Sequence, residues 1–445
     1  MNAILNLRRI FVSIMLLLAI AAGTAAAAQQ RPIVFVHGNG DYAALWTTTI
    51  WRFESNGYSP DLLFAINMAH PKSPSNDLKP AKNQSTTIDQ AAQLASFVTR
   101  TLLTTGQDKV ILIGSSRGGN AIRNYIKFAG GHANVALAVL CGTPNHGVFA
   151  APAAFDSEWN GKGHFLSRLN AITEVYPGVP MVTTRSDKND KYAQPTGEFI
   201  GQPGKPTGVS YDGPELRGAL NIVLPERDHR EVAFHPDAFK EIFRVITGHA
   251  PAKLDVVPEV APVLNGMISG SENKADTNLP LAGAKVAVYV VDPDTGERKG
   301  DAVRQISTTE DGLWGPLTAD PKAYYEFVVN AEGYPTTRYY LTPFPRSSRY
   351  IHFRLDPPND KHKNAGAAVT LSRPRGYLGH GRDNFQIDGT VPDGVNKGVP
   401  GTASATQMYP VGTDKAVKVV LNEESVTVKI RPEDKGHEIV VPFHY

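Results

Sequence analysis

The fold is decided by the stretch Val110-Ile111-Leu112-Ile113-Gly114-Ser115-Ser116-Arg117-Gly118-Gly119. Its first four residues form a short continuous apolar run, which is typical of a strand buried on both faces of a sheet. Gly114 and Gly118 permit a sharp turn, and residues 120–128 have the pattern of a helix. A buried strand, a tight turn and a helix in succession indicate an α/β fold with a parallel sheet.

The same alternation extends on both sides of this stretch. Further apolar runs that predict buried strands lie at 33–36, 135–141, 179–184 and 219–224. A helix is expected at 87–103, where Thr87-x-x-Gln90 has the capping-box pattern, and another at 236–246, before Gly248. We therefore expect residues 29–250 to form an α/β domain whose mostly parallel sheet carries helices on both faces.

The composition changes after residue 250. Prolines 251, 258 and 262 predict a semi-rigid linker over 251–262. Strand candidates follow at 285–291, 324–329, 350–355 and 416–421, and helical periodicity is nearly absent. The C-terminal region is therefore expected to be all-β and sandwich-like, with one module at 263–358 and a second at 366–445.

The charge balance and the cysteine count exclude some functions. The chain of 445 residues has 45 Lys+Arg against 43 Asp+Glu, a net charge of +2. A nucleic-acid binder would need clustered cations facing phosphate, so no nucleic-acid partner is expected. Cys141 is the single cysteine, so the chain has neither an intramolecular disulfide nor a cysteine-based zinc site.

The first 28 residues have the pattern of a signal peptide. Arg8 and Arg9 precede an apolar run at 10–22, and small residues follow at 25–28. The apolar run is shorter than the roughly 20 residues of a transmembrane helix. Arg8-Arg9-Ile10-Phe11-Val12 also resembles a twin-arginine signal. We therefore expect cleavage after Ala28 and export, by the Sec or the twin-arginine route, to the periplasm or the exterior, with no transmembrane span in the mature chain.

Gly114-Ser115-Ser116-Arg117-Gly118 matches the pattern G-x-S-x-G. The pattern is weak alone, but the expected strand before it and helix after it are the context of a nucleophile elbow. This makes Ser116 a candidate nucleophile. A serine hydroxyl needs a base to remove its proton and an acid to orient that base, and on this architecture the order is serine, acid, histidine.

The base is expected on the loop between the last strand and the last helix. His229 directly follows the expected strand and is preferred, and His235, just before the helix, is the alternative. The acid is expected after the preceding strand, where both Asp187 and Asp190 lie on one turn. Asp228 is a weaker rival because side chains of adjacent residues rarely face each other.

Acyl transfer also requires donors for the oxyanion of the tetrahedral intermediate. One is expected to be the backbone N–H of Arg117, the residue after the nucleophile. The other is expected on the loop after the first strand, in Val36-His37-Gly38-Asn39-Gly40, at the backbone N–H of Asn39. His37 is expected to hold this loop and to take no part in proton transfer.

Three motifs together resemble the secreted lipase/esterase branch of the α/β-hydrolases. They are Val36-His37-Gly38-Asn39-Gly40, Gly114-Ser115-Ser116-Arg117-Gly118-Gly119 and Gly142-Thr143-Pro144-Asn145-His146-Gly147. Asp190-x-x-Ala-x-Pro is similar to the surroundings of the acid in related hydrolases and favours Asp190. The resemblance covers about 31–250 and implies hydrolysis of carboxylic esters through an acyl-enzyme on Ser116, with no metal or organic cofactor.

Two departures from this family concern the substrate. Ser115 replaces the common histidine before the nucleophile, and Arg117 stands where an uncharged residue is usual. A cation next to the nucleophile would favour a substrate with a polar or anionic part over a plain triglyceride. Residues 148–178 are too apolar for a bare loop; they are expected to form a cap over an acyl pocket or, alternatively, a helix packed on the sheet.

The β region leaves further hypotheses open. Some lipases of this group carry an appended C-terminal β-domain, and the first β module also resembles transthyretin-like modules. Its clustered aromatic residues, between 324 and 353, would form either a platform for a lipid, polymer or glycan surface or cross-strand core pairs. Besides an esterase or lipase acting on an ester or lipid, the alternatives are an extracellular polyester depolymerase and a non-catalytic surface-binding protein on a hydrolase scaffold.

Overall fold

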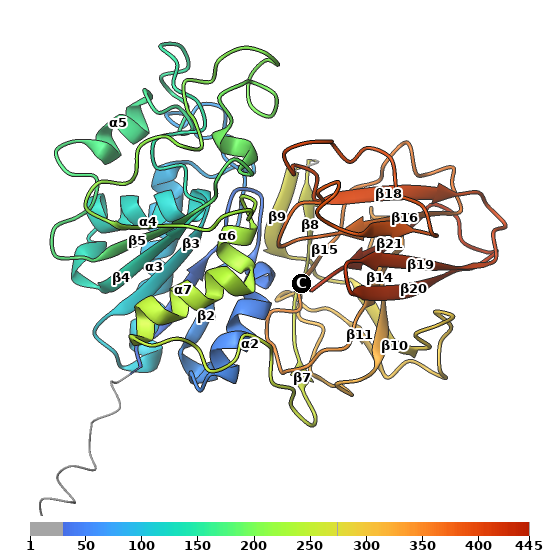
Figure 1. Cartoon of the computed structure of the whole chain (residues 1–445). Helices are drawn as coiled ribbons and strands as arrows, with labels where there is room; N and C mark the ends of the chain where they lie inside the picture. Colours follow the sequence, from blue (N-terminus) through green and yellow to red (C-terminus); the bar gives the residue numbers. More distant parts are fainter. Residues whose placement is uncertain (1–29, 274, 445) are drawn as a thin grey trace, which may run out of the picture. The chain divides into compact units, whose positions relative to one another are not determined.

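A parallel sheet forms the centre of the first half of the molecule (Figure 1). The computed structural model describes residues 30–273 and 275–444. The strands lie in the order β2 (Leu63–Ala65), β1 (Ile33–Val36), β3 (Val110–Ser115), β4 (Val135–Cys141), β5 (Met181–Arg185), β6 (Leu220–Val223). All neighbours pair in parallel, which confirms the predicted sheet.

Helices cover both faces of this sheet because side chains alternate along each buried strand. Ile33 and Phe35 of β1 face a core formed with α2 (Thr47–Ser55), α6 (Glu231–Phe234) and α7 (Pro236–Thr247). Val34 and Val36 face the opposite core, formed with α3 (Thr87–Thr105) and α4 (Arg117–Phe128). The short α5 (His164–Asn170) packs a separate apolar cluster above α4.

The start of α3 differs by one residue from the prediction. The capping box is made by Thr86 and Asp89, each of which bonds the backbone N–H of the other, and not by Thr87 and Gln90. Thr87 is instead held by Asp77, which accepts bonds from its backbone N–H and its hydroxyl. Thr87, which the sequence pattern assigned to the N-cap, is therefore bonded to the buried Asp77 and does not cap the helix.

A seven-stranded sheet forms the centre of the C-terminal region. Its order is β11 (Arg304–Ser307), β10 (Lys285–Val291), β13 (Tyr324–Asn330), β14 (Thr337–Leu341), β21 (His437–Pro442), β16 (Ala367–Ser372), β18 (Ser404–Tyr409). β14 and β21 pair in parallel, from Thr337 opposite Glu438 to Tyr339 opposite Val440. Strands from both predicted β modules therefore join in one sheet, and the module boundaries stay predictions.

Three smaller sheets complete this region, which confirms its all-β character. They are β12 (Leu317–Thr318) with β7 (Val263–Leu264); β15 (Phe353–Arg354), β8 (Ile268–Glu272) and β9 (Ala275–Pro280); and β17 (Phe385–Ile387), β19 (Lys415–Leu421) and β20 (Glu424–Ile430). Most of the clustered aromatic residues are buried here; Phe327 packs against Trp314 and Phe353, with ring centroids 5.0 and 4.9 Å away.

The β region packs directly on the α/β part within the compact unit Pro32–Tyr445. Trp51 of α2 is buried in the core of the β region and donates a 2.8 Å hydrogen bond to the Ser347 carbonyl. Asn278 donates to the carbonyl groups of Asp41 and Met68, at 3.0 and 2.9 Å. The two parts are thus joined by buried polar contacts as well as by the chain.

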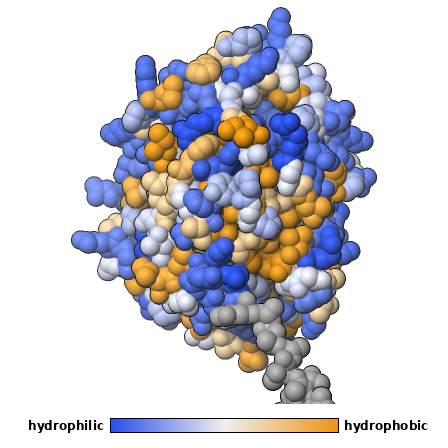
Figure 2. Space-filling view, turned by 90° about the vertical axis from the view of Figure 1, so that its left-hand side faces the viewer, coloured by the Kyte–Doolittle hydropathy of each residue, from blue (hydrophilic) through white to orange (hydrophobic). Residues whose placement is uncertain are grey.

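The surface of the α/β side mixes hydrophilic and apolar residues (Figure 2). Among residues 30–273 and 275–444, no helix is both long and apolar enough to cross a membrane. The predicted signal peptide, 1–28, lies outside the described residues.

Candidate active site

Ser116 lies at the junction of β3 and α4, in a backbone conformation that side chains rarely adopt. Its φ is 52° and its ψ is −120°. The turn is tight because glycines surround it: a Cβ on Gly114 would lie 2.8 Å from the backbone of Gly118 and Gly119. A Cβ on Gly118 would lie 2.6 Å from the carbonyl oxygens of Val36 and His37. The predicted strand, turn and helix therefore hold Ser116 in a strained turn at the carboxyl end of the sheet.

The structure brings Ser116, His229 and Asp190 together. Ser116 Oγ lies 3.0 Å from His229 Nε2, and His229 Nδ1 lies 2.9 Å from Asp190 Oδ2. His229 comes from the loop between β6 and α6, and Asp190 from the loop after β5. The side chain of His229 is 5% exposed and that of Asp190 13%. A buried carboxylate in this place can fix the orientation of the imidazole toward the serine.

The two alternative residues have other partners. Asp187 accepts hydrogen bonds from the backbone N–H groups of Asn189 and Glu226, at 3.0 and 2.8 Å, and so ties the acid loop to the histidine loop. His235 is the N-cap of α7 and accepts a 3.1 Å hydrogen bond from the backbone N–H of Asp237. Burial lowers the pKa of His235 to about 4.

The loop after β1 packs against the serine. A Cβ on Gly38 would lie 3.2 Å from the Cβ of Ser116, so a side chain there would crowd Ser116. The neighbouring Asn39 is exposed and lines the cavity at Ser116, while its side-chain oxygen accepts from the backbone N–H of Ser73. His37 is fully buried, its ring bonds the Gly38 carbonyl and the Met68 N–H, and burial lowers its pKa to about 4.

Arg117 was expected to offer a cation to the substrate, but its side chain is buried and does not line the cavity at Ser116. Both Arg117 and Glu158 are 2% exposed, and the guanidinium donates to both carboxylate oxygens, at 2.5 and 2.8 Å. It also donates to the carbonyl groups of Pro71 and Ser85. Burial raises the pKa of Glu158, although Arg117 opposes this. With these partners Arg117 anchors the segment around Glu158, and it does not offer a free cation to a substrate.

Two cavities adjoin the histidine. The one that reaches Ser116 has a volume of about 290 Å³, and half of the residues that line it are aromatic or apolar: Val148, Phe149, Trp159, Tyr192, Ile200 and Tyr377. Three of them come from 148–178, the segment predicted to be a cap. The polar members of the lining include Asp41 and Arg230, which form a 2.6 Å ion pair.

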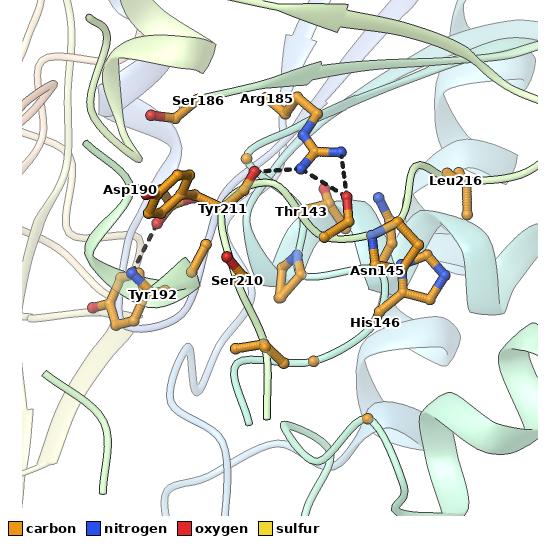
Figure 3. Close-up of a pocket in the computed structure, with 18 of the residues that line it drawn as sticks. Thr143, Asn145, His146, Arg185, Ser186, Asp190, Tyr192, Ser210, Tyr211 and Leu216 are labelled. Atoms are coloured by element: carbon orange, nitrogen blue, oxygen red, sulfur yellow. Dashed lines mark hydrogen bonds between the residues drawn. The ribbon is translucent and has the colours of Figure 1, made fainter. Parts of the chain in front are cut away.

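The second cavity, of about 510 Å³, contacts Asp190 and His229 but not Ser116 (Figure 3). Arg185 lines it and donates to the carbonyl groups of Tyr211 and Gly213. Because a substrate would have to reach the candidate nucleophile Ser116, we take the smaller cavity as the candidate substrate site. Within the described part of the chain, no cluster of three or more His, Cys, Asp or Glu residues could hold a metal ion.

Sequence reasoning missed several residues of the smaller cavity. Tyr192 lies two positions after Asp190, and its ring is 4.6 Å from that of His229 in an edge-on arrangement. Arg230 directly follows His229, so the neighbours of both motif residues were available as candidates. Tyr377 lies in the β region, in a segment with no recognisable motif, and only the fold reveals it.

Comparisons with known proteins agree with this architecture. A model of the class 2 lipases matches residues 30–157, and a model of the lipase C-terminal domain matches residues 263–358. No curated protein matches the chain.

Three similar solved structures are lipases. Bacillus licheniformis lipase BlEst2 in mature form is 20% identical, with 49% of this chain and 93% of that chain covered and a TM-score of 0.36. Its propeptide form is 15% identical, with 90% and 92% covered and a TM-score of 0.38. Aspergillus fumigatus lipase B is 15% identical, with a TM-score of 0.37; the match covers 52% of this chain and only 56% of that one.

Because these TM-scores are low, the family assignment rests on the two family models and on the parallel sheet. The class 2 lipase model spans β1, the Ser116 turn and the start of the predicted cap, and the second model spans the first part of the β region. The chain is therefore a carboxylic ester hydrolase of the lipase type, with an α/β-hydrolase core and a C-terminal β-domain.

Proposed function

We propose that the protein is an exported serine hydrolase that cleaves carboxylic esters through a Ser116–His229–Asp190 triad and an acyl-enzyme. The observation that carries this proposal is the pair of hydrogen bonds at His229, 3.0 Å to Ser116 Oγ and 2.9 Å to Asp190 Oδ2. Nucleophile, base and acid are each within hydrogen-bond reach of the next group, as the chemistry requires.

In the first half of the reaction, Ser116 Oγ attacks the ester carbonyl while His229 Nε2 takes the hydroxyl proton. Asp190 accepts the Nδ1–H bond and stabilises the imidazolium that forms. The tetrahedral intermediate collapses when His229 returns the proton to the leaving alkoxide, which departs as the alcohol and leaves the acyl group on Ser116. Water, deprotonated by His229, then attacks this ester, and His229 returns the proton to Ser116 Oγ as the acid product is released.

The negative charge of the tetrahedral intermediate needs donors that are already in place. We propose the backbone N–H groups of Asn39 and Arg117 for this role. The close approach of Gly38 to Ser116 supports the first, and the position of Arg117 as the first residue of α4 supports the second, because N–H groups of a helix start have no partner inside the helix.

The size of the cavity favours short acyl groups. Its volume of about 290 Å³ is at the small end of ligand-binding cavities, which typically measure about 300–1,000 Å³. We therefore expect an esterase profile, with activity declining from short and medium chains to palmitoyl esters.

The experiment is an assay of the mature protein on p-nitrophenyl esters from acetyl to palmitoyl, beside Ser116→Ala, His229→Ala and His235→Ala. Ser116→Ala and His229→Ala should lose roughly 10³-fold or more in kcat. His235→Ala, which changes the N-cap residue of α7, should retain the wild-type kcat. A fluorophosphonate should label Ser116, as read by peptide mass spectrometry. Undiminished hydrolysis by Ser116→Ala would refute the mechanism and leave the alternative of a non-catalytic binding protein with a contaminating activity.

Export is proposed from the sequence of residues 1–28 alone. Expression of the full chain in a bacterial host should give a mature product that begins at Gln29, read by N-terminal sequencing of the periplasmic and extracellular fractions. A product that keeps residues 1–28 in the cytoplasm would contradict it.

The burial of most β-region aromatic residues gives no support to a docking platform for a solid polyester.

A further inference from the structure

The C-terminal β region contributes to the cavity at Ser116. Tyr377, in the turn after β16, is 4% exposed and lines this cavity together with Ser116 and His229. Two cations adjoin its ring: Lys191 Nζ lies 4.1 Å from the ring centroid, and the Arg230 guanidinium 5.6 Å. Lys191 is also bonded to the Gly401 carbonyl, at 2.7 Å. The Tyr377 ring is thus packed against two residues of the α/β part, one of which is itself bonded to the β region.

The same segment holds the residue directly before His229. Asp228 is fully buried, and its Oδ2 accepts hydrogen bonds from the backbone N–H of Tyr377, at 2.7 Å, and from Arg382 Nη2, at 3.2 Å. Its Oδ1 accepts from the backbone N–H groups of Arg230 and Glu231 and so shapes the loop itself. The position of the base therefore depends on contacts with the β region.

A second buried acid on this loop is held in the same way. Glu231 accepts from Arg373 Nη2 at 2.7 Å and from Arg382 Nη1 at 2.9 Å. Burial, and then the neighbouring Asp228 carboxylate, raise the pKa of Glu231 to about 7. Buried carboxylates without partners are strongly unfavourable, so Arg382 stabilises both acids in these places and Arg373 stabilises Glu231.

We propose that residues 373–383 of the β region are part of the active site, with Tyr377 as a specificity-determining wall of the acyl cavity and Arg373 and Arg382 as positioning residues for His229. This inference rests on the proposed function of Ser116 and His229. It assigns to the β region a role in substrate selection and in the positioning of His229, which differs from docking on a surface.

The wall is tested with Tyr377→Ala and a matched control, Tyr324→Ala, which removes a half-buried tyrosine from β13. Removing the Tyr377 ring lengthens the cavity, so the ratio of kcat/KM for p-nitrophenyl octanoate over acetate should rise roughly tenfold, within the range that a change in an apolar pocket produces. Tyr324→Ala should leave the ratio within twofold. An unchanged ratio in Tyr377→Ala would overturn this part.

The positioning role is tested with Arg382→Gln and Arg382→Lys, with Arg338→Gln as the matched control. Arg338 is a more deeply buried arginine of the β region, 2% exposed against 24% for Arg382, and it pairs with Glu326 and Asp434. At a temperature where all variants are folded, Arg382→Gln should lose roughly tenfold to a hundredfold in kcat on p-nitrophenyl acetate, because small displacements of a catalytic group cost this much. Arg338→Gln should lower the Tm but keep kcat within twofold.

Arg382→Lys keeps the charge but cannot donate to both acids in the same geometry, so it should lie between the wild type and Arg382→Gln, at about a threefold loss. If Arg382→Gln does not fold, Arg382→Lys is the variant that tests the positioning role. Wild-type kcat in either folded Arg382 variant would overturn the positioning role. Ser116→Ala separates the two failures: if it is inactive while the Arg382 and Tyr377 variants behave as wild type, only this inference fails, and if it is active, the proposed function fails.

Discussion

The backbone N–H of Tyr377 donates a 2.7 Å hydrogen bond to Asp228, the residue directly before His229 and 149 positions earlier in the chain. Because Asp228 is fully buried, this bond and the Arg382 contact satisfy a carboxylate that water does not reach. The histidine loop therefore does not have a structure independent of the β region. Substitutions far from the G-x-S-x-G motif in sequence can for this reason alter the chemistry.

The assignment of the acid gives a first prediction. Asp190→Asn keeps the shape but removes the charge that orients His229, so kcat on p-nitrophenyl butyrate should fall by roughly 10²- to 10⁴-fold, with KM little changed. Asp187→Asn, the matched control, replaces one of the two carboxylate oxygens that accept from backbone N–H groups, and should lower the Tm while kcat stays within a few fold. The reverse order of kcat losses would assign the acid to Asp187.

The buried pair of Arg117 and Glu158 gives a second prediction. Glu158→Gln leaves the guanidinium without its charge partner, and breaking such a pair costs about 3–5 kcal/mol of unfolding free energy. Urea unfolding measures this loss. The exposed pair Arg244–Glu241 serves as the control, since Glu241→Gln should cost less than about 1 kcal/mol.

The same pair bears on substrate choice. Because Arg117 is engaged with Glu158, Pro71 and Ser85, Arg117→Met should not change the ratio of kcat/KM between a neutral ester and a hemiester that carries a carboxylate. A selective loss on the anionic ester, in a variant whose folding is confirmed by circular dichroism, would restore the interpretation of Arg117 as a substrate cation.

The turn at Ser116 gives a further prediction. A Cβ on Gly118 would lie 2.6 Å from two backbone carbonyl oxygens of the β1 end, and backbone cannot move aside as a side chain can. Gly118→Ala should therefore displace Ser116 or the first loop and lower kcat by at least about tenfold, beside a loss of about 1–3 kcal/mol from overpacking. Wild-type kcat and Tm together would show that the turn is looser than the geometry indicates.

The sheet could be predicted because its inner strands are largely buried on both faces and appear in the sequence as apolar runs. Val110–Ser115 and Val135–Cys141 are such runs. The last strand, Leu220–Val223, was also expected to be buried, but Leu220 and Val223 are exposed because β6 is an edge strand. Leu63–Ala65 escaped because three residues are too few for a pattern. The first turn of α3 was misplaced by one residue because Thr86 and Thr87 are both suitable caps, and only Asp77, a distant residue, decides between them.

The site could be predicted where chain order and loop position restrict the choice. Ser116 and His229 were predicted from a motif and from the last loop of the α/β pattern. The turn after the preceding strand left Asp187 and Asp190 open, and the resemblance to related hydrolases favoured Asp190. Partners that meet only through the fold could not be predicted. Arg117 is adjacent to the nucleophile in sequence, yet Glu158 takes its side chain elsewhere, and Tyr377 reaches the cavity from another sheet.

The buried histidines give the last prediction, which concerns stability against pH. Burial lowers the pKa of His352 from 6.5 to about 4, so between these values the unfolded chain binds a proton that the folded chain does not. The unfolding free energy therefore rises with pH through this window. The contribution of the neutral His352 to stability is lost as the pH falls from 6.5 toward 4. His37 and His444 act in the same direction, with pKa values lowered by burial to about 4 and about 3.

His352→Asn tests this relation, because the amide oxygen can accept from the backbone N–H of Met267 as His352 Nδ1 does but does not titrate. Urea unfolding at pH 7, 6 and 5 should show a slope against pH that is smaller by up to about 1.4 kcal/mol per pH unit, the value for one proton. His380→Asn removes an exposed histidine and measures the effect of the substitution itself. Equal slopes in the wild type and His352→Asn would show that His352 takes up its proton without unfolding.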